Sequence, residues 1–352
     1  MANGIRGVLG QLPRRTGTRR TRPGYEDTSI DIELTNACNA RCNFCPRHNM
    51  PKLGLMESRI FYKAVERGLE FLDGPVFKFC GTGDALLHRE IVGYAKHIAD
   101  LGCEIWITTN GSLMTGNKAK SLIDAGVKRV YFSISSRGEQ YEAEYGLGYE
   151  RTHSNILRFI DLAKGRCQVV IARVLHDRGV DYEQDKTYWL SKGVANLMDF
   201  DLVNRAGALF PLPLQTVSVD EVSRARASLR QRGEWTICTV PFAYLFIGWD
   251  GNYYLCSSDW RKQAPLGHVD THSIEATLAA RHRCVGSRGP ICFQCSNDPV
   301  NRYIAAYGIP RLITHGVNGH AVPAGDVDAL ADSLRHSSGR SPTPEDDGSS
   351  GM

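Results

Sequence analysis

Short apolar runs alternate with amphipathic segments between residues 28 and 205 of the chain. The strand-like runs, rich in β-branched and aromatic residues, lie at 29–34, 76–79, 104–111, 129–135 and 168–175. Segments with apolar residues at helical spacing lie at 57–72, 89–101, 115–126 and 153–164. Residues 189–203 indicate the end of a helix followed by a sixth strand. Repeated strand–helix units predict a parallel sheet, and six units are too few for a closed eight-stranded barrel.

The sequence therefore predicts an α/β fold, a partial (β/α)6 barrel. The pattern then changes: residues 218–232 read as a charged helix, and residues 238–300 combine short strand-like runs, turns and cysteines. The expected organisation is a basic flexible arm, the barrel, a linker with a helix, a small cysteine-rich domain and a tail, at residues 1–27, 28–205, 206–237, 238–310 and 311–352. From about residue 337 the tail has the composition of a disordered terminus.

Composition narrows the class of protein. The net charge of +4 over 352 residues is small, so we expect neither a nucleic acid nor a membrane as partner. No apolar run approaches the roughly 18 residues of a membrane span, and none follows the Arg14–Arg15 pair, which argues against an export signal. Eleven cysteines without such a signal favour metal ligation in a cytoplasmic protein over disulfide bonds.

Three of these cysteines share one short loop after the first predicted strand. Cys38, Cys42 and Cys45 stand in "LTNACNARCNFCP" with the spacing C-x3-C-x2-C. Thiolates are soft ligands that select zinc, cuprous copper or iron–sulfur clusters. Such a loop can hold three irons of a cubane and leave the fourth iron without a protein ligand. The alternatives are a zinc site completed by His48 or a distant cysteine, and reduced structural cysteines.

With Phe44 between the second and third of these cysteines, the chain resembles the radical S-adenosylmethionine enzymes. Their signature is C-x3-C-x-aromatic-C at the end of the first barrel strand, and the resemblance continues over residues 28–205. It implies a 4Fe-4S cluster held by the three cysteines, with S-adenosylmethionine on the fourth iron. It also implies a one-electron reductant such as flavodoxin or ferredoxin.

Later segments resemble the cofactor-binding segments of that family, in the same order. "CGTGDALLH" at 80–88 is similar to the Gly-Gly-Glu-Pro segment that receives the methionine amino group, with Asp84 for Glu and Ala85 for Pro. "TTNG" at 108–111, "FSIS" at 132–135 and "IARV" at 171–174 resemble segments of the third, fourth and fifth strands. The cofactor contacts implied by the resemblance are Phe44, Gly81, Gly83, Asp84, Asn110, Ser133, Ser135 and Arg173.

A second group of cysteines follows the barrel. Cys238 and Cys256 stand as C-x12-G-x4-C around an Asp-Gly turn that predicts a hairpin, and Cys292 and Cys295 could complete a four-thiolate site. A four-cysteine zinc ribbon with an oversized gap is the alternative. By resemblance this is a shortened "twitch" form of the SPASM extension. Because residue 301 is Asn and no cysteine follows, one auxiliary 4Fe-4S cluster is implied, which makes two clusters in all.

The four remaining cysteines have no metal role in this reading. Cys103 and Cys167 are expected to be small buried hydrophobic residues. Cys80, at the end of a strand, and Cys284 are the candidate catalytic residues, because either thiol could return a hydrogen atom to a substrate radical.

The single auxiliary cluster resembles that of aminocyclitol dehydrogenases and aminoglycoside epimerases of antibiotic biosynthesis. We therefore expect a small carbohydrate-like substrate, an amino sugar, aminocyclitol or sugar nucleoside, oxidised at a hydroxyl-bearing carbon with the auxiliary cluster as electron acceptor. Asp84, Asp199 and Asp201 are candidates to meet substrate amines. Radical epimerisation, dehydration or decarboxylation are the alternatives.

Two further classes are less favoured. A peptide maturase commonly has an N-terminal peptide-clasping domain, and 28 residues precede the first predicted strand here. A non-enzymatic zinc-binding module would need both cysteine groups to bind zinc. Residues 315–335 resemble a segment of nucleotide-sugar glycosyltransferases, but they are too short for a nucleotide-binding domain, and we interpret them as part of the tail.

Overall fold

The computed structural model describes residues 28–176, 181–212 and 217–307. Packing of the backbone divides the chain into two units. Unit 1 comprises Met1–Phe200 and Val240–His282, and unit 2 comprises Asp201–Thr239 and Arg283–Met352. The predictions for the N-terminal arm, for residues 315–335 and for the tail lie outside the described residues.

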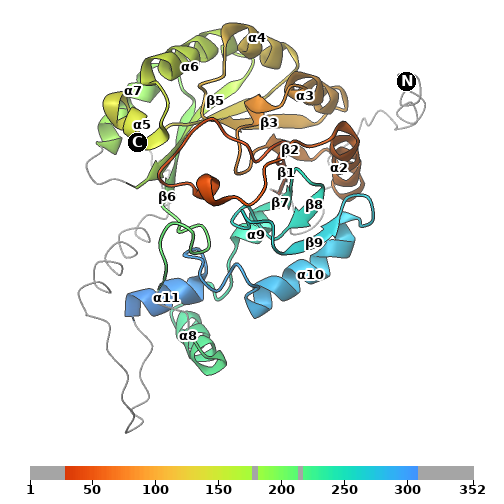
Figure 1. Ribbon diagram of the computed structural model, residues 1–352, viewed down its shortest axis with the longest axis vertical. Coiled ribbons are helices and arrows are strands. Elements are labelled where there is room, and N and C mark those ends of the chain that lie inside the picture. The colour runs from red at the N-terminus through yellow and green to blue at the C-terminus, as the bar shows by residue number, and fades with distance from the viewer. Residues whose placement is uncertain (1–27, 177–180, 213–216, 308–352) are drawn as a thin grey trace, which may run out of the picture. The chain divides into compact units, whose positions relative to one another are not determined.

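Unit 1 is built on one sheet, in which the described strands follow the order β6-β5-β4-β3-β2-β1-β7-β8-β9 (Figure 1). The first six strands along the chain are β1 (Ser29–Ile32), β2 (Val76–Phe79), β3 (Glu104–Thr109), β4 (Arg129–Ser133), β5 (Gln168–Leu175) and β6 (Asn196–Asp201). Strands β1 to β5 are paired in parallel. The predicted α/β sheet of six successive strands is thereby confirmed.

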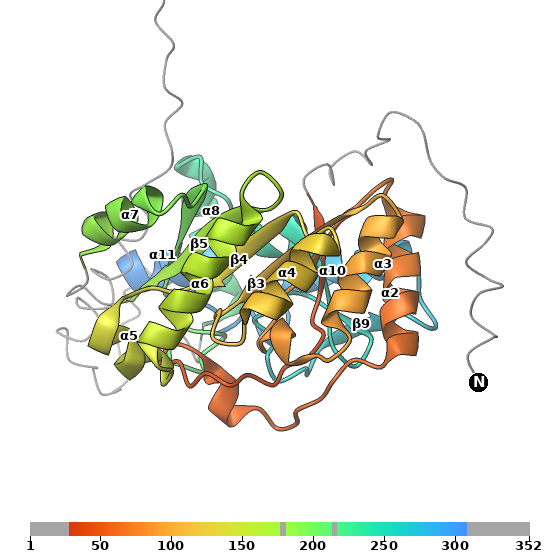
Figure 2. The ribbon, with the colours of Figure 1, turned by 90° about the horizontal axis from the view of Figure 1, so that it is seen from above.

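Helices connect the strands and cover one face of the sheet, where α2, α3, α4 and α6 follow one another (Figure 2). Their bounds are α2 (Ser58–Phe71), α3 (Ile91–Asp100), α4 (Gly116–Asp124), α5 (Gly138–Tyr145), α6 (Tyr149–Ala163) and α7 (Tyr182–Ser191), with short 3-10 turns η1 (Pro46–Asn49) and η2 (Ala85–Leu87). Helix α5 was not predicted. It ends at Gly146, whose φ of +64° is the left-handed conformation that glycine adopts without strain.

The two faces of the sheet differ in character because strand side chains alternate. Ile30 and Phe77 are fully buried on the helix-covered face, where α2 lies close enough for a Cβ on Gly68 to meet Phe77 at 2.8 Å. On the opposite face the register aligns Asp31 with Lys78 and Lys78 with Trp106. The parallel sheet thus has an apolar side and a side that carries charged and polar groups.

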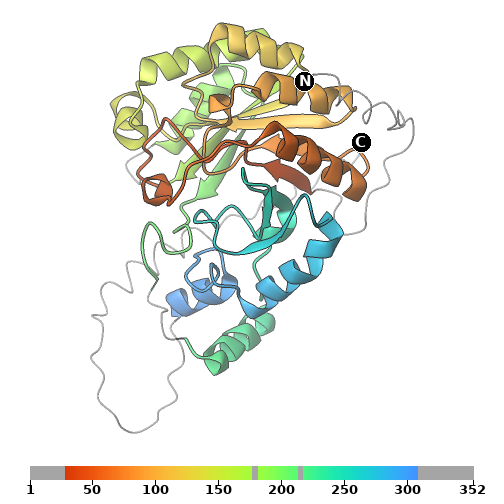
Figure 3. The ribbon, with the colours of Figure 1, turned by 45° about the vertical axis from the view of Figure 1, so that its right-hand side comes forward.

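The hairpin predicted around residue 250 is confirmed, and it extends the barrel sheet. Strand β7 (Tyr244–Ile247) pairs in parallel with β1, while β8 (Asn252–Tyr254) and β9 (Pro265–His268) continue antiparallel. The turn residue Gly251 has φ +83°. Figure 3 shows these teal strands with helix α10 (Ile274–Ser287), which was not predicted, beside them. The region after β6 therefore contributes strands to unit 1.

Unit 2 has a small core of its own. Helices α8 (Val219–Gln231) and α11 (Pro299–Tyr307) pack together. The buried residues of this core are Leu212, Ala225, Leu229, Val300 and Ile304. The predicted helix over 218–232 is confirmed as α8, which begins with a capping box between Ser218 and Glu221. No helix in the described parts of either unit is long and apolar enough to cross a membrane.

Candidate functional site

The three clustered thiols lie on the loop that leaves β1 at the carboxyl edge of the sheet. Burial, and next the charge of Asp84, raise the pKa of Cys38 to about 11. Burial, followed by the charges of Cys45 and Cys38, raises the pKa of Cys42. Each sulfur thus lies within electrostatic range of the others, and a bound cation would favour their thiolate forms.

The thiol loop already offers polar partners for sulfur. The Ala40 amide donates to Cys38 Sγ at 3.4 Å, and Asn110 Nδ2 donates to the same sulfur at 3.8 Å. Amide–sulfur contacts of this kind accompany iron–sulfur thiolates and influence their potential. In the described ranges, no group of three or more His, Cys, Asp or Glu side chains is arranged to hold a metal ion. The three thiols fit an iron–sulfur cluster by their chemistry, because thiolates are the soft donors that such clusters take.

The end of α5 anchors this loop. The amides of Arg41 and Asn43 donate to the carbonyls of Tyr145 and Glu144 at 2.7 and 3.1 Å. Phe44 is 9% exposed, and its ring lies edge-on to Tyr145 at 5.3 Å between centroids. A helix that the sequence pattern missed therefore fixes the backbone on both sides of the second thiol, Cys42.

The segment after β2 passes very close to the thiol loop. A Cβ on Gly83 would lie 2.3 Å from the Thr35 carbonyl oxygen and 2.4 Å from that of Ala37. The amide of Asp84 donates to the Ala37 carbonyl at 2.9 Å. Only glycine permits this approach, so residue 83 brings the backbone of residues 81–84 against the segment that leads into Cys38.

Asp84 connects the ends of β2 and β3. Its carboxylate accepts hydrogen bonds from the Leu86 amide, the Thr109 hydroxyl and the Asn110 amide. Burial raises its pKa although these donors oppose the shift. Asp84 is 2% exposed and its hydrogen bonds connect the loops after β2 and β3. This role differs from the expectation that Asp84 meets a substrate amine.

The two candidate serines at the end of β4, Ser133 and Ser135, differ in their surroundings. Ser135 is fully buried; its hydroxyl shares a hydrogen bond with Tyr145 and accepts one from the Val174 amide. Ser133 is half-buried at the end of β4, paired with Ala172 of β5. Ser133 therefore remains the better candidate for a cofactor contact, while Ser135 links β4, β5 and α5.

Arg173, an expected cofactor contact, is buried among other side chains of unit 1. Strand alternation puts it on the same face as Ile171, against α7, and its side chain is 0% exposed. It makes two hydrogen bonds to Asp199 at 2.7 and 2.8 Å, one to the Tyr182 carbonyl at 2.6 Å and an ion pair with Asp185 at 3.3 Å. The expectation of a cofactor-carboxylate contact is corrected: Arg173 joins β5, β6 and α7.

The candidate hydrogen donors occupy different units. Cys80 follows β2 in unit 1, and its thiol donates to Asp31 Oδ2 at 3.0 Å; burial and then the Asp31 charge raise its pKa. Cys284 lies in α10, within unit 2. Asp199, expected to meet a substrate amine, pairs with Arg173, and burial raises the pKa of Asp201.

The auxiliary cysteines divide between the units: Cys256 follows β8 in unit 1, and Cys238, Cys292 and Cys295 belong to unit 2. Within unit 2, Asn301 Nδ2 donates to the carbonyls of Cys292 and Cys295, each at 2.8 Å. This carboxamide stands where the longer form of the extension has a cysteine. It binds the loop that carries the C-x2-C pair, and the four-thiolate site remains a prediction.

The sequence analysis did not identify several ionisable side chains beside the thiol loop. Glu33, directly after β1, pairs with Lys262 at 2.8 Å, and the His176 ring lies 4.6 Å from Phe44 and 3.2 Å from Glu144. Of these side chains, only Glu33 could have been identified from the sequence. It follows Asp31 by two residues, so strand alternation puts it on the same polar face, directly before the thiol loop. The partners of the others come from distant segments.

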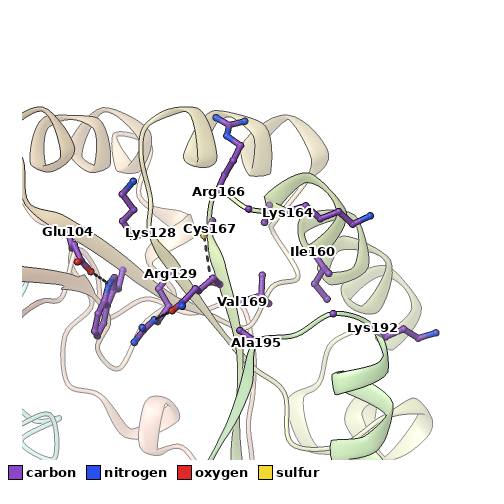
Figure 4. A pocket seen from close by; sticks show the side chains of 15 residues that line it. Glu104, Lys128, Arg129, Ile160, Lys164, Arg166, Cys167, Val169, Lys192 and Ala195 are labelled. Atoms are coloured by element: carbon purple, nitrogen blue, oxygen red, sulfur yellow. Dashed lines mark hydrogen bonds between the residues drawn. The ribbon is translucent and has the colours of Figure 1, made fainter.

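A cavity of about 650 Å³ lies at the opposite, amino-terminal edge of strands β3 to β6 (Figure 4). Its cationic lining residues are Lys128, Arg129, Lys164, Arg166 and Lys192. Cys167, expected to be buried, is partly exposed there. Because sites in α/β sheets form at the carboxyl ends of strands, this cavity is separate from the thiol site.

Comparison with known families agrees with the residue types and spacing of the thiol loop. Residues 32–188 match the radical SAM superfamily, and residues 238–296 match an iron–sulfur cluster-binding domain, SPASM. The chain carries a radical SAM domain followed by a SPASM-type domain. The first match runs from the end of β1 into α7 and contains the three thiols, and the second contains the C-x12-G-x4-C and C-x2-C cysteines.

Curated relatives of the radical SAM and SPASM domains differ in what they do. The chain is 31% identical over 104 residues to a tungsten-containing aldehyde ferredoxin oxidoreductase cofactor-modifying protein of Pyrococcus furiosus, covering 29% of each chain. It is 25% identical over 298 residues to a PqqA peptide cyclase of Bradyrhizobium diazoefficiens, covering 78% of this chain and 74% of the relative. The chain spans between 29% and 35% of the length of the first three curated relatives.

Among solved structures, anSMEcpe with bound AdoMet and the Cp18Cys peptide has the same fold. The match has a TM-score of 0.57 at 15% identity and covers 88% of this chain and 96% of that chain. At this identity the likeness concerns the fold alone.

Proposed function

We propose that this chain is a radical S-adenosylmethionine enzyme that removes a hydrogen atom from a hydroxyl-bearing carbon of an amino sugar, aminocyclitol or sugar nucleoside. The observation that carries the proposal is the close approach of the thiol loop to residues 81–84, enforced at Gly83. When bound, the cluster and S-adenosylmethionine supply a 5′-deoxyadenosyl radical after one-electron reduction by a flavodoxin or ferredoxin.

The protein residues hold and orient these groups. Cys38, Cys42 and Cys45 would hold the cluster, and the amides of Ala40 and Asn110 stabilise the Cys38 sulfur. The backbone of residues 81–83 would receive the amino group of the cofactor.

The outcome proposed is oxidation to a ketone. A substrate carbon radical next to a hydroxyl becomes a ketone when it loses that proton and one electron, and an auxiliary cluster, which Cys238, Cys256, Cys292 and Cys295 would hold, would supply the electron acceptor. Epimerisation is the alternative within the same class. Cys80 suits that role because its raised pKa keeps the hydrogen on sulfur, and the S–H bond then breaks homolytically toward the substrate radical.

A second candidate substrate class is a peptide. The likeness to the PqqA peptide cyclase favours it, since a match that covers 78% of this chain must overlap both domains. Peptide modification would use the same radical and the same residues around the thiol loop. The two candidates therefore differ in substrate and share the initiating chemistry.

Anaerobic turnover in deuterated water separates the possibilities. With aminocyclitol and amino-sugar intermediates, a loss of two hydrogens in mass supports oxidation, and a gain of one deuterium at unchanged composition supports epimerisation through an exchangeable thiol. Conversion of a precursor peptide, with none of the sugars consumed, would replace the carbohydrate proposal by the peptide candidate.

A further inference from the structure

Glu33 and Lys262 form a buried ion pair beside the expected cofactor loop. Their side chains are 0% and 11% exposed, and Lys262 Nζ lies 2.8 Å from Glu33 Oε2. The other carboxylate oxygen, Oε1, accepts hydrogen bonds from the Thr82 amide at 2.9 Å and the Thr82 hydroxyl at 2.6 Å. Burying two charges has a large desolvation cost, which the 2.8 Å contact and the hydrogen bonds to Oε1 partly offset.

Glu33 determines the path of the backbone at residues 81 and 82. A Cβ on Gly81 would meet Glu33 Cγ at 2.5 Å and Oε1 at 2.6 Å, so the loop lies directly on this carboxylate. Two donors of Thr82 are directed at Oε1. The segment expected to receive the amino group of S-adenosylmethionine therefore rests on Glu33.

Lys262 is held in place by a tight turn from the C-terminal region. Its φ of +58° is uncommon for a residue with a side chain and indicates that the surroundings fix its backbone. The Lys262 amide donates to the Asp259 carbonyl at 3.0 Å, and the Asp259 amide donates to the Cys256 carbonyl at 3.2 Å. The carboxylate of Asp259, 1% exposed, also accepts the amides of Gln263 and Ala264.

Two aromatic rings enclose the ammonium group. Lys262 Nζ lies 4.4 Å from the centroid of the Phe246 ring and 4.7 Å from that of Tyr254. Cation–π contacts partly compensate a desolvated ammonium and leave Glu33 as its anionic partner. Strands β7 and β8, which carry these rings, thus direct the lysine toward β1.

We propose that Glu33 and Lys262 are positioning residues for S-adenosylmethionine. Through this ion pair, the turn after Cys256 fixes the loop that receives the cofactor's amino group. The inference rests on the proposed function and deepens it. Lys262 holds the Glu33 carboxylate in one rotamer, and Glu33 holds Thr82 and the backbone of Gly81. Cofactor affinity then depends on a lysine contributed by the SPASM-type domain.

The test measures S-adenosylmethionine binding to the anaerobically reconstituted full-length protein by equilibrium dialysis. Glu33→Gln and Lys262→Met are each expected to raise the Kd by about tenfold to a hundredfold, the range found for groups that orient metal-site ligands. Because both changes remove the same ion pair, the double variant should have a Kd for S-adenosylmethionine no higher than the higher of the two single-variant values. Lys96→Met is the control: it removes an exposed lysine of α3 paired with Asp100 and should leave the Kd unchanged.

Iron content and Tm accompany each Kd. If the pair positions the cofactor loop, the variants raise the Kd while their iron content stays at the wild-type value. If the pair is purely structural, the variants lower iron content and Tm together and leave the Kd of the cluster-loaded fraction unchanged, which overturns the inference. If Glu33→Gln does not fold, Thr82→Val removes only the hydroxyl donor to Oε1 and is expected to raise the Kd as well. If the wild-type protein binds S-adenosylmethionine and no variant changes the Kd, the inference is wrong and the proposed function stands. If the wild-type protein does not bind S-adenosylmethionine, the proposed function is wrong as well.

Discussion

Gly83→Ala tests the close approach between the cofactor loop and the thiol loop. The added Cβ would lie 2.3 and 2.4 Å from the carbonyl oxygens of Thr35 and Ala37, whereas real Cβ contacts are essentially never shorter than 3.0 Å. The two segments must therefore separate by at least about 0.7 Å. Since both clashing atoms are backbone atoms, no side chain can rotate away to relieve the contact.

The magnitude follows from two contributions. Overpacking a tight contact costs about 1–3 kcal/mol. Separation also stretches the hydrogen bond from the Asp84 amide to Ala37, which is worth about 1 kcal/mol. We expect the free energy of unfolding to fall by about 2–4 kcal/mol, and the affinity for S-adenosylmethionine to fall because the receiving backbone moves.

Chemical denaturation and anaerobic equilibrium dialysis measure the two effects of Gly83→Ala. Gly93→Ala is the matched control, since a Cβ at that position in α3 meets nothing within 4 Å. It should stabilise the protein by up to about 1 kcal/mol through helix propensity and leave binding unchanged. A Gly83→Ala variant with wild-type stability and affinity would refute the account of this contact.

Three further predictions concern other parts of the described structure. Arg173→Met should destabilise the protein by about 1–3 kcal/mol, because it removes the buried donor to Asp199 and to the Tyr182 carbonyl, while Asp185 keeps its ion pair with Arg137. S-adenosylmethionine affinity, measured on the folded fraction, should be unchanged, and a selective loss of affinity would restore the cofactor role expected from the sequence. Asn301→Ala removes the donor to the Cys292 and Cys295 carbonyls and should lower auxiliary iron content with little change at the first cluster, as measured by iron and sulfide analysis; equal losses from both clusters would contradict it. The folded-state pKa of Cys80 lies above its ordinary value of 9.0, so the unfolded chain loses the thiol proton first and the free energy of unfolding falls as pH rises above 9. In Cys80→Ser the fall of this free energy with pH should be shallower. An identical slope in the two proteins would exclude this contribution.

Much of unit 1 could be predicted from periodicity and turn chemistry. Strand β2 was expected at 76–79 and spans Val76–Phe79, and the Asp-Gly turn at 250–251 correctly indicated the β7–β8 hairpin. These signals are local, because they depend on neighbouring side chains and on the backbone freedom of glycine. Helices α5 and α10 escaped prediction, and both have weak amphipathic patterns.

The candidate site was predictable where a short motif carries it. The spacing of the thiols and the glycines at 81 and 83 were visible in the sequence. The role of Arg173 was not, because the alternation of β5 decides which face it occupies, and its partners Asp185 and Asp199 are 12 and 26 residues away. Lys262 and Glu33 lie far apart in sequence and meet only through the pairing of β1 with β7.

Release of 5′-deoxyadenosine tests the central claim most directly. Anaerobically reconstituted protein is reduced with dithionite in the presence of S-adenosylmethionine, and 5′-deoxyadenosine and methionine are quantified. We expect the wild-type protein to contain about eight irons, as two 4Fe-4S clusters would supply, and to release both products in equal amounts. Cys42→Ala should release neither. Protein that contains zinc without sulfide, or a Cys42→Ala variant that cleaves S-adenosylmethionine as well as the wild type, would contradict the assignment of the three-thiol loop.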